Sequence, residues 1–282
     1  MVSVASLSLY PIKSCGGIAL QSAQVGAYGL EANGIGDREW MLVDADGLFL
    51  SQRELPALAR VRTAFGDGPW IEVSAPGLPV LRLRTDEGPA THPRRTVAIW
   101  SDQLAALDAG EAAAVWFSGL VGTPVRLARF DDRETRHADP GWTGGLKAKT
   151  RFPDGFPILL LSQASLEDLN ARWTLDGKPP LDMARFRPNI VLEGIGAYEE
   201  DFLASLRAGA LELRPVKPCP RCTIPAVDPA SGVAGPSPLE LLMAYRFDPA
   251  VGGATFGQNA VVTGGAGATL TVGQAFEPRW NF

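Results

Sequence analysis

The chain has 282 residues, of which 46% are hydrophobic and 20% are charged. This balance supports a sizeable buried core and excludes a disordered chain, and the length fits two domains or one large β domain. The formal net charge is −5 and no region is strongly basic, which disfavours non-specific binding to nucleic acid. Gly and Pro are abundant, at 31 and 23 residues, and such a composition is typical of many short strands and turns.

The beginning of the chain carries no basic segment, and Pro11 and Lys13 end its first apolar run. No later segment approaches the roughly 18 apolar residues of a membrane span. The three cysteines, Cys15, Cys219 and Cys222, are too few and odd in number for a disulfide scaffold. We therefore expect a cytoplasmic protein without a membrane segment.

Short strands are predicted through the first half of the chain. In order, they cover residues 2–10, 40–43, 48–51, 61–65, 70–73, 80–83, 97–100 and 125–130. Apolar residues at helical spacings predict a helix over residues 103–120. The polar segment 131–156 is interpreted as a long surface loop or linker, a kind of segment that is often functional or mobile.

The second half is predicted to mix strands with short helices. Strands are expected at 156–161, 189–192 and 210–216, and helices at 162–170, 198–207 and 238–246. Ser165, with Asp168 three residues later, resembles a capping box at the first of these helices. Residues 260–263 and 269–272 flank a Gly-rich turn and predict a final hairpin. The fold class is therefore mainly β with some α.

Motifs of several enzyme classes are absent from the sequence. There is no Walker A motif, no Gly-x-Gly-x-x-Gly, no His-Glu-x-x-His and no Gly-x-Ser-x-Gly. The two histidines, His92 and His137, lie in polar segments and are interpreted as solvated loop residues. Hydrolysis that depends on a histidine therefore has few candidates.

The segment Cys219-Pro-Arg-Cys222 is the most distinctive local feature, and four interpretations compete for it. A redox pair of the thioredoxin type needs a helix after the first thiol, but Pro225 and Pro229 follow closely. A zinc site needs further ligands, and no other cysteine or histidine stands at a metal-binding spacing. Two small buried thiols in a Pro-rich turn are the third interpretation.

The fourth interpretation makes a thiolate of this segment the ligand of a metal that a cofactor brings. Thiolates suit soft and intermediate metals. The neighbouring cations Lys217 and Arg221 would favour the anionic form of the thiol and would also suit a phosphate. The residues alone leave this interpretation level with that of two buried thiols.

A second set of polar residues is scattered along the chain beside apolar strands. It comprises Lys13, Ser14, Arg38, Arg187 and Asn189. A charge in such a place is costly without a partner. Each arginine by itself is expected to pair with an acid such as Asp37 or Asp182. The alternative is that the set converges on one anionic ligand, for which the bidentate fork of arginine is well suited.

Taken together, these segments resemble the MOSC family, in which a MOSC domain follows an N-terminal β-barrel-type domain. The matching segments, in the order of the family, are Tyr10-Pro-Ile-Lys-Ser-Cys-Gly-Gly, Asp37-Arg-Glu-Trp-Met-Leu-Val-Asp, Phe156-Pro-Ile-Leu-Leu-Leu-Ser-Gln-Ala-Ser-Leu-Glu-Asp-Leu-Asn, Arg185-Phe-Arg-Pro-Asn-Ile-Val, Cys219-Pro-Arg-Cys-Thr-Ile-Pro-Ala-Val-Asp-Pro and Phe256-Gly-Gln-Asn. The resemblance covers nearly the whole chain. It implies an N-terminal β-rich domain over residues 1–130 and a MOSC β-barrel core over residues 131–282.

The resemblance also implies a molybdenum cofactor, a pterin dithiolene (molybdopterin) that holds molybdenum and ends in a phosphate. By the family's pattern, Cys222 is the metal ligand and the catalytic residue. The family's phosphate and pterin contacts correspond to Lys13, Ser14, Arg38, Ser162, Arg187, Asn189 and Arg221.

The chain is most similar to the amidoxime-reducing branch of the family. That branch implies an oxidoreductase, independent of pyridoxal phosphate, which reduces amidoximes, hydroxylamines and N-hydroxy bases. Because no cysteine follows Cys222, the electrons are expected from a separate donor, a ferredoxin-like or cytochrome b5-like protein with its reductase. Two alternatives stay open: a sulfur carrier or sulfurtransferase with a persulfide on Cys222 that Cys219 resolves, and a non-catalytic carrier of the cofactor.

Overall fold

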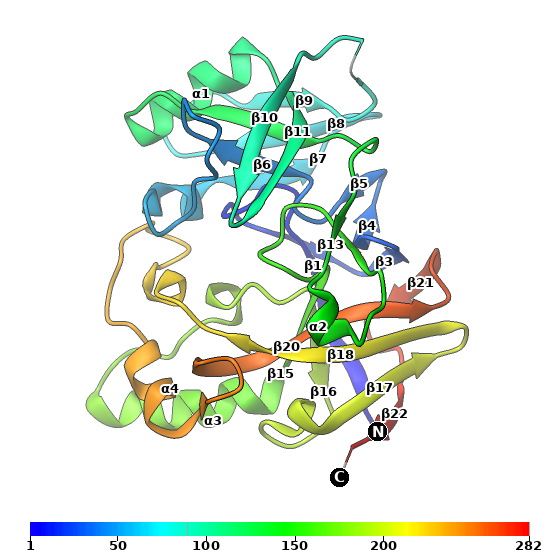
Figure 1. The fold of residues 1–282 in the computed structure, drawn as a ribbon. Helices are drawn as coiled ribbons and strands as arrows, with labels where there is room; N and C mark the ends of the chain where they lie inside the picture. The colour runs from blue at the N-terminus through cyan, green and yellow to red at the C-terminus, as the bar shows by residue number, and fades with distance from the viewer. Residues whose placement is uncertain (89, 282) are drawn as a thin grey trace.

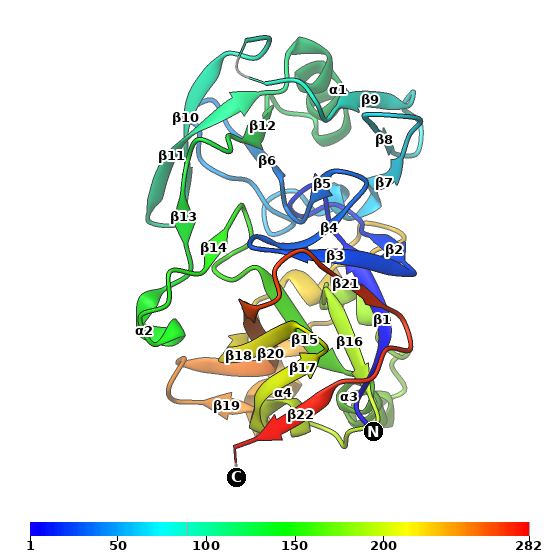
Figure 2. The ribbon, with the colours of Figure 1, turned by 90° about the vertical axis from the view of Figure 1, so that its right-hand side faces the viewer.

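The computed structural model describes residues 1–88 and 90–281 of the chain. Figure 1 shows a lower part built around one large sheet and an upper part with smaller sheets and the helix α1. Both ends of the chain lie at the far end of the lower part (Figures 1 and 2). The prediction of a mainly β fold with some α-helix is confirmed.

The large sheet has nine strands and forms the base of the molecule. In spatial order they are β2 (Ile18–Leu20), β1 (Ser3–Leu9), β16 (Ile190–Glu193), β15 (Ile158–Ser162), β20 (Gly253–Gly264), β18 (Leu211–Pro220), β17 (Leu203–Ala208) and β22 (Glu277–Trp280), with β19 (Phe247–Asp248) paired to β20. Strands β15 and β16 are parallel, and α3 (Gln163–Trp173) makes the crossover that a parallel pair requires. The helix α4 (Leu239–Tyr245) packs on β20.

Strand β1 joins the start of the chain to this sheet. It pairs antiparallel with β16, with Leu7 opposite Ile190. One step before β16, the backbone N–H of Ser8 donates to the carbonyl of Asn189 at 2.9 Å. The loop that follows β1 is therefore brought next to the loop that precedes β16, although almost 180 residues separate them in the sequence.

The upper part consists of three smaller sheets. Their strands are β10 (Arg94–Ile99), β11 (Asp102–Asp108), β12 (Arg126–Phe130) and β6 (Trp40–Val43); β7 (Arg62–Phe65), β8 (Trp70–Ser74) and β9 (Leu81–Arg84); and β21 (Ala268–Thr271), β3 (Ser22–Gly26), β4 (Gly29–Ala32) and β5 (Ile35–Gly36). The helix α1 (Glu111–Val121) packs on β12 and β9, and its Phe117 is fully buried. The main hydrophobic core runs through both parts of the molecule, which fixes them against each other.

The segment 131–156 is more structured than a surface loop, contrary to the prediction. It holds β13 (Arg136–His137), α2 (Pro140–Thr143) and β14 (Lys149–Thr150), and Phe152 is fully buried. Arg136 is also buried, because its guanidinium pairs with Asp102 and donates to several backbone carbonyls. A charged side chain that finds so many acceptors can be buried, so polarity alone predicted exposure wrongly.

Two predicted helices are wrong in part. Residues 103–108 belong to strand β11, where Leu104 and Ala106 point inward at a period of two, and Gly110 with φ of 91° separates this strand from α1. Of residues 198–207, only the 3-10 helix η4 (Glu199–Phe202) is helical, and strand β17 follows. A short apolar run fits a helix and a buried strand equally well.

Two predicted strand arrangements are also wrong. The last two predicted strands form no hairpin, because β20 pairs with β15 and β18 while β21 crosses to β3 in the upper part. Residues 48–51 form only isolated bridges. The remaining 3-10 helices are η1 (Pro56–Arg60), η2 (Thr174–Asp176), η3 (Met183–Arg185) and η5 (Ile224–Ala226).

Candidate functional site

One open cavity gathers most of the side chains that the sequence singled out. Its lining includes Lys13, Ser14, Arg38, Arg187, Asn189, Cys219, Arg221 and Cys222, which come from four separate stretches of the chain. The large sheet contributes Leu159 on β15 and Asn259 on β20, which are partners in the sheet register. The space between its walls is about 800 Å³ when the open solvent at the mouth is counted.

Asn189, directly before β16, joins its own stretch to that of Arg38 and to strand β15 through its side-chain amide. Its Nδ2 donates to Asp37 Oδ1 at 2.9 Å, and its Oδ1 accepts from Arg38 Nη1 at 3.1 Å. The same oxygen accepts from the backbone N–H of Leu159 at 3.1 Å. Asp37 is fully buried, pairs with Arg38 and accepts from the backbone N–H of Tyr10. This satisfied polar network fixes the position of Arg38 on the cavity wall.

Three residues of the lining adopt a backbone conformation that is rare outside glycine. The angle φ is 69° at Ser14, 46° at Arg38 and 58° at Arg187. Only a few per cent of non-Gly residues lie in this region, and those that do are concentrated at sites where strain serves a ligand. Arg38 and Arg187 both lie over the ring of Tyr10, at 4.4 and 4.3 Å from its centroid. The local backbone therefore holds both guanidinium groups beside one aromatic ring.

Positive charge dominates the lining. The cationic side chains are Lys13, Arg38, Arg53, Arg187 and Arg221, and among the described residues they face one lining carboxylate, that of Asp154. Burial, and then the charge of Arg38, lower the pKa of Arg187 to about 10. Burial also lowers the pKa of Lys13, and the carboxylate of Asp154 opposes that shift. Crowded cations of this kind are stabilised by an anionic ligand.

The two cysteines of the Cys-x-x-Cys segment lie on the same cavity. Cys219 is the last residue but one of β18, Cys222 follows the strand, and both thiols are free and partly exposed. Arg221 connects this segment to the backbone that directly precedes Arg187. Its Nη1 donates to Cys219 Sγ at 3.2 Å, and its Nη2 donates to the carbonyl of Phe186 at 2.9 Å. Within residues 1–88 and 90–281, the sulfur of Cys222 has no hydrogen-bond donor, so its lone pairs are available to a ligand.

Two guanidinium N–H groups on this lining are buried without an acceptor. They belong to Arg187 Nη2 and Arg221 Nε, and neither arginine pairs with a carboxylate in the described part of the chain. Each such orphan costs about 1–3 kcal/mol, which an anionic ligand with several oxygens would recover. Cys222 adds the sulfur donor that a soft or intermediate metal prefers. The residues present therefore fit an anionic, metal-carrying cofactor.

Comparison with known proteins agrees with this arrangement. The family model described as "MOSC N-terminal beta barrel domain" matches residues 1–124, and the "MOSC domain" model matches residues 147–277. The chain is 34% identical over 252 residues to the mitochondrial amidoxime reducing component 2 of Bos taurus, covering 88% of this chain and 73% of that protein. The chain belongs to the MOSC family.

Other amidoxime-reducing members give the same result. Component 1 of Mus musculus is 35% identical over 256 residues, with 88% of this chain and 72% of that protein covered. Component 1 of Homo sapiens is 34% identical over 250 residues, with 86% and 72% covered. The similarity thus extends over both MOSC-type domains rather than over one motif.

Ser162, which the MOSC resemblance assigned to the cofactor, does not line this cavity. It is the N-cap of α3, is fully buried, and donates its backbone N–H to Glu200 Oε1 at 3.1 Å. Ser165 is not the helix cap that the sequence predicted, because it lies inside α3 and donates its hydroxyl to the same Oε1 at 2.7 Å. The buried carboxylate of Glu200, whose pKa burial raises, therefore holds the hydroxyl of Ser165, whereas the hydroxyl of Ser162 is buried without a partner in the described residues.

Cys15 lies in the MOSC motif next to Ser14 but behind the cavity wall. It is fully buried, and burial raises the pKa of its thiol to about 12. Its carbonyl accepts from Arg187 Nη1. The contribution of Cys15 to the site is therefore its backbone oxygen rather than its sulfur.

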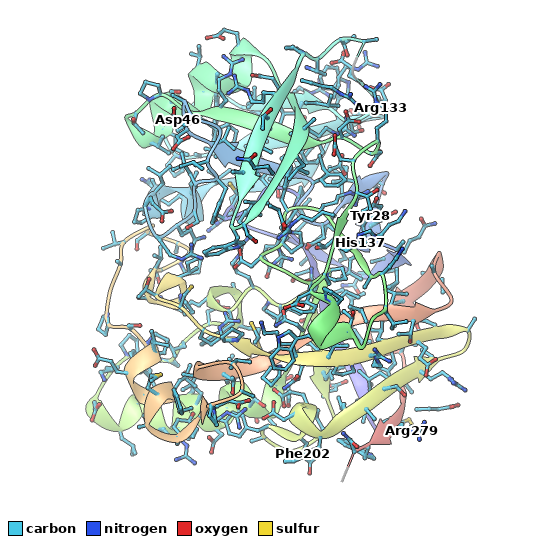
Figure 3. All side chains as sticks on the ribbon, in the orientation of Figure 1. Tyr28, Asp46, Arg133, His137, Phe202 and Arg279 are labelled. Atoms are coloured by element: carbon cyan, nitrogen blue, oxygen red, sulfur yellow. The ribbon has the colours of Figure 1, made fainter. Side chains whose placement is uncertain are left out.

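The remaining candidates lie elsewhere. His92 pairs with Glu87, and His137, labelled in Figure 3, lies exposed on β13. No group of three or more metal-ligating side chains occurs in the described residues. In the same residues, none of the helices has the length and apolar character to cross a membrane.

Sequence reasoning missed the residues at the mouth of the cavity. Arg53 and Asp154 line it, and Asp154 pairs with Lys13. Asp154 lies in the segment that was interpreted as a surface loop. The available signal was a polar turn directly before a buried strand, a location in which functional residues are common.

Proposed function

We propose that this MOSC protein is a molybdenum-dependent oxidoreductase that reduces N-hydroxylated compounds with electrons from a separate redox protein. The cavity with its orphaned N–H groups and free thiol supports a bound molybdenum cofactor, and the names of the relatives support amidoxime reduction. The observation that carries the proposal is the position of Cys222 on the same cavity as six predicted cofactor contacts.

The proposed roles of the chain's own side chains follow from chemistry. Cys222 would hold the metal through its sulfur, since thiolates suit such a centre. Arg187 and Arg221 would offer their free N–H groups to the anionic end of the cofactor, and Asn189 keeps Arg38 in place beside it. Lys13 would add a point charge.

When bound, the cofactor would supply two-electron chemistry that removes the oxygen of the N–OH group. The net reaction takes one N-hydroxyl compound, two electrons and two protons to the reduced nitrogen compound and water. The protein's part is to bind the cofactor and to keep the metal accessible at the open mouth. We place the reaction in the cytoplasm, with a ferredoxin-like or cytochrome b5-like donor.

The test is expression in a host that makes the cofactor, followed by molybdenum and pterin analysis and an assay with a chemical reductant. Cys222→Ala should lose most of its molybdenum and its activity on benzamidoxime. Cys219→Ala is the matched control, because it removes a thiol from the same cavity and should keep the metal. Full molybdenum occupancy in Cys222→Ala would refute the assignment.

The contact between Arg221 and Cys219 favours a second candidate, a sulfur carrier. Here Cys222 would carry a persulfide sulfur received from a cysteine desulfurase, and the Cys219 thiol would attack its inner sulfur to release hydrosulfide and form a disulfide. A labile adduct of about 32 Da on Cys222, without bound metal, would support this function. Tight cofactor binding without turnover would instead indicate a carrier of the cofactor.

A further inference from the structure

Tyr10 lies behind the wall of the cavity that holds Cys222. Its side chain is only 4% exposed and lines a second cavity, and Arg187 lines both cavities. Burial raises the pKa of the phenol more than the charges of Arg187 and Arg38 lower it, so the ring is neutral at ordinary pH. The proposed cofactor contacts do not include Tyr10, although two of the arginines among them contact its ring.

The ring of Tyr10 is the shared contact of two like charges. The guanidinium carbons of Arg38 and Arg187 lie 4.4 and 4.3 Å from its centroid. The two cations repel each other: after burial, the charge of Arg38 is the next cause that lowers the pKa of Arg187. An aromatic face attracts a cation, and it does so more strongly where water is excluded. Tyr10 therefore offsets part of the repulsion for both arginines.

Backbone contacts fix Tyr10 where both arginines reach it. Its N–H donates to the buried carboxylate of Asp37 at 2.9 Å, and its carbonyl accepts from the N–H of Arg38 at 2.7 Å. Gly17 provides the space for the ring, because a Cβ at that position would lie 2.7 Å from Cε1 of Tyr10. Carbon atoms in favourable contact lie about 3.5–4.0 Å apart, so a larger residue at position 17 would displace the ring.

We propose that Tyr10 is a positioning residue for the anionic group of the cofactor, because its ring holds the guanidinium groups of Arg38 and Arg187 together on one cavity wall. This inference deepens the proposed function, since it concerns the same cavity. Without the ring, repulsion would move the two cations apart, and an anion would bind them less tightly. A tyrosine that only filled space could instead be replaced by another apolar side chain without a change in anion binding.

The first test uses inorganic phosphate as the probe on cofactor-free protein, so it requires neither molybdenum nor a reductant. Isothermal titration calorimetry gives the dissociation constant. We expect Tyr10→Leu, which keeps apolar bulk but removes the ring, to bind phosphate about tenfold more weakly, because two desolvated contacts are lost. Tyr10→Phe keeps an aromatic face and should bind within about twofold of the wild type. Phe117→Leu is the matched control, since it removes a fully buried ring of the upper part and should leave the phosphate affinity unchanged.

A second variant displaces the ring without removing it. Gly17→Ala places a methyl group against Tyr10 and should also weaken phosphate binding, which keeps the test open if Tyr10→Leu does not fold. Gly119→Ala on α1 is its control, because a Cβ there meets no atom within 4 Å outside the backbone of its own helix. This control should bind phosphate like the wild type.

A double-mutant cycle separates positioning from packing. If Tyr10 acts through the arginines, Tyr10→Leu should weaken phosphate binding much less in an Arg187→Met background, because one of the two contacts is already absent. An equal effect of Tyr10→Leu in both backgrounds would show that the ring does not act through Arg187 and would overturn the proposal.

The loaded protein extends the comparison to the cofactor. The molybdopterin content of Tyr10→Leu should fall about tenfold, and that of Tyr10→Phe should match the wild type. If the wild type binds no phosphate, or if Tyr10→Leu and Gly17→Ala bind it as tightly as the wild type, the positioning role is overturned, whatever the protein reduces. If the phosphate results are as expected but the wild type holds no molybdenum, the proposed function fails and the role of Tyr10 in anion binding stands.

Discussion

Arginines lie beside strands in two regions of this molecule, and the two regions treat them differently. On β10 and β12 of the upper part, each of Arg94, Arg95, Arg126 and Arg129 pairs with a carboxylate. On the cavity, Arg187 and Arg221 pair with none in the described residues and keep buried N–H groups without acceptors.

Asp108 shows what complete pairing achieves. It is buried, accepts from Arg95 and Arg126, and also accepts from the backbone N–H of Gly110 ahead of α1. Both of its carboxylate oxygens accept hydrogen bonds from within the protein, which is how a buried charge is tolerated. On the cavity, Arg187 and Arg221 keep buried N–H groups that have no acceptor in the described residues. These groups favour the binding of an anionic molecule.

The largest expected effect concerns the thiol of Cys15, which lies next to the cavity. Cys15 lies behind Arg187, and its pKa of about 12 leaves its thiolate about a thousandfold scarcer at pH 8 than that of an ordinary thiol. Iodoacetamide should therefore label Cys219 and Cys222 in cofactor-free native protein, and Cys15 only after unfolding. Peptide mass spectrometry gives the labelling rate of each site. Rapid native labelling of Cys15 would mean that solvent reaches behind the cavity wall.

The next effect concerns the paired region. Asp108→Asn should lower the free energy of unfolding by about 2 kcal/mol, because it leaves Arg95 and part of Arg126 without a charge partner. Urea unfolding of cofactor-free protein measures this change. Cofactor content should be the same as in the wild type, since Asp108 lies outside the cavity.

The pH dependence of that difference checks its electrostatic origin. Desolvation would raise the pKa of Asp108, but the bonds from Arg126 and Gly110 and the nearby charges lower it overall. A carboxyl with a lowered pKa in the folded state stabilises above its unfolded pKa of about 3.9 and loses that contribution as the pH falls. The gap between wild type and Asp108→Asn should shrink below about pH 4. A gap that is constant with pH would indicate packing instead of charge.

The sequence predicted the strands of the upper part better than it predicted which strands pair with each other. Periodicity identified β6, β7, β8 and β12 within a residue or two, because their alternating or continuous apolar runs depend only on local burial. Periodicity failed where a neighbouring strand determines the conformation or the pairing of a segment. Residues 103–108 become a strand because β10 and β12 flank them, and 269–272 pair with β3 rather than with β20.

The candidate site shows the same division. From the residues alone, each arginine is expected to pair with an acid such as Asp37 or Asp182. The structure pairs Arg38 with Asp37, but Arg187 pairs with no carboxylate in the described residues, and Arg185 takes Asp228 instead. The residues alone offered convergence on one anionic ligand as the alternative, and the family resemblance favoured that alternative. The resemblance carried no information on Arg53 and Asp154, because those residues reach the cavity through tertiary structure and share no motif.

The smallest expected change in stability, at Arg187, is the sharpest test of the contrast. Arg187→Met removes a buried cation that faces Arg38 and has no acid, so relief of desolvation and repulsion should offset the lost bond to the Cys15 carbonyl. The free energy of unfolding of cofactor-free protein should change by less than about 1 kcal/mol. Cofactor content should nevertheless fall more than about tenfold, since a hydrogen bond from a charged donor contributes about 1.5–3 kcal/mol. Arg187→Lys keeps the charge but not the guanidinium fork, so its cofactor content should lie between those of the wild type and Arg187→Met. If Arg187→Met instead unfolded as easily as Asp108→Asn and still retained cofactor, Arg187 would be a structural arginine like those of β12, and the distinction between the two regions would be lost.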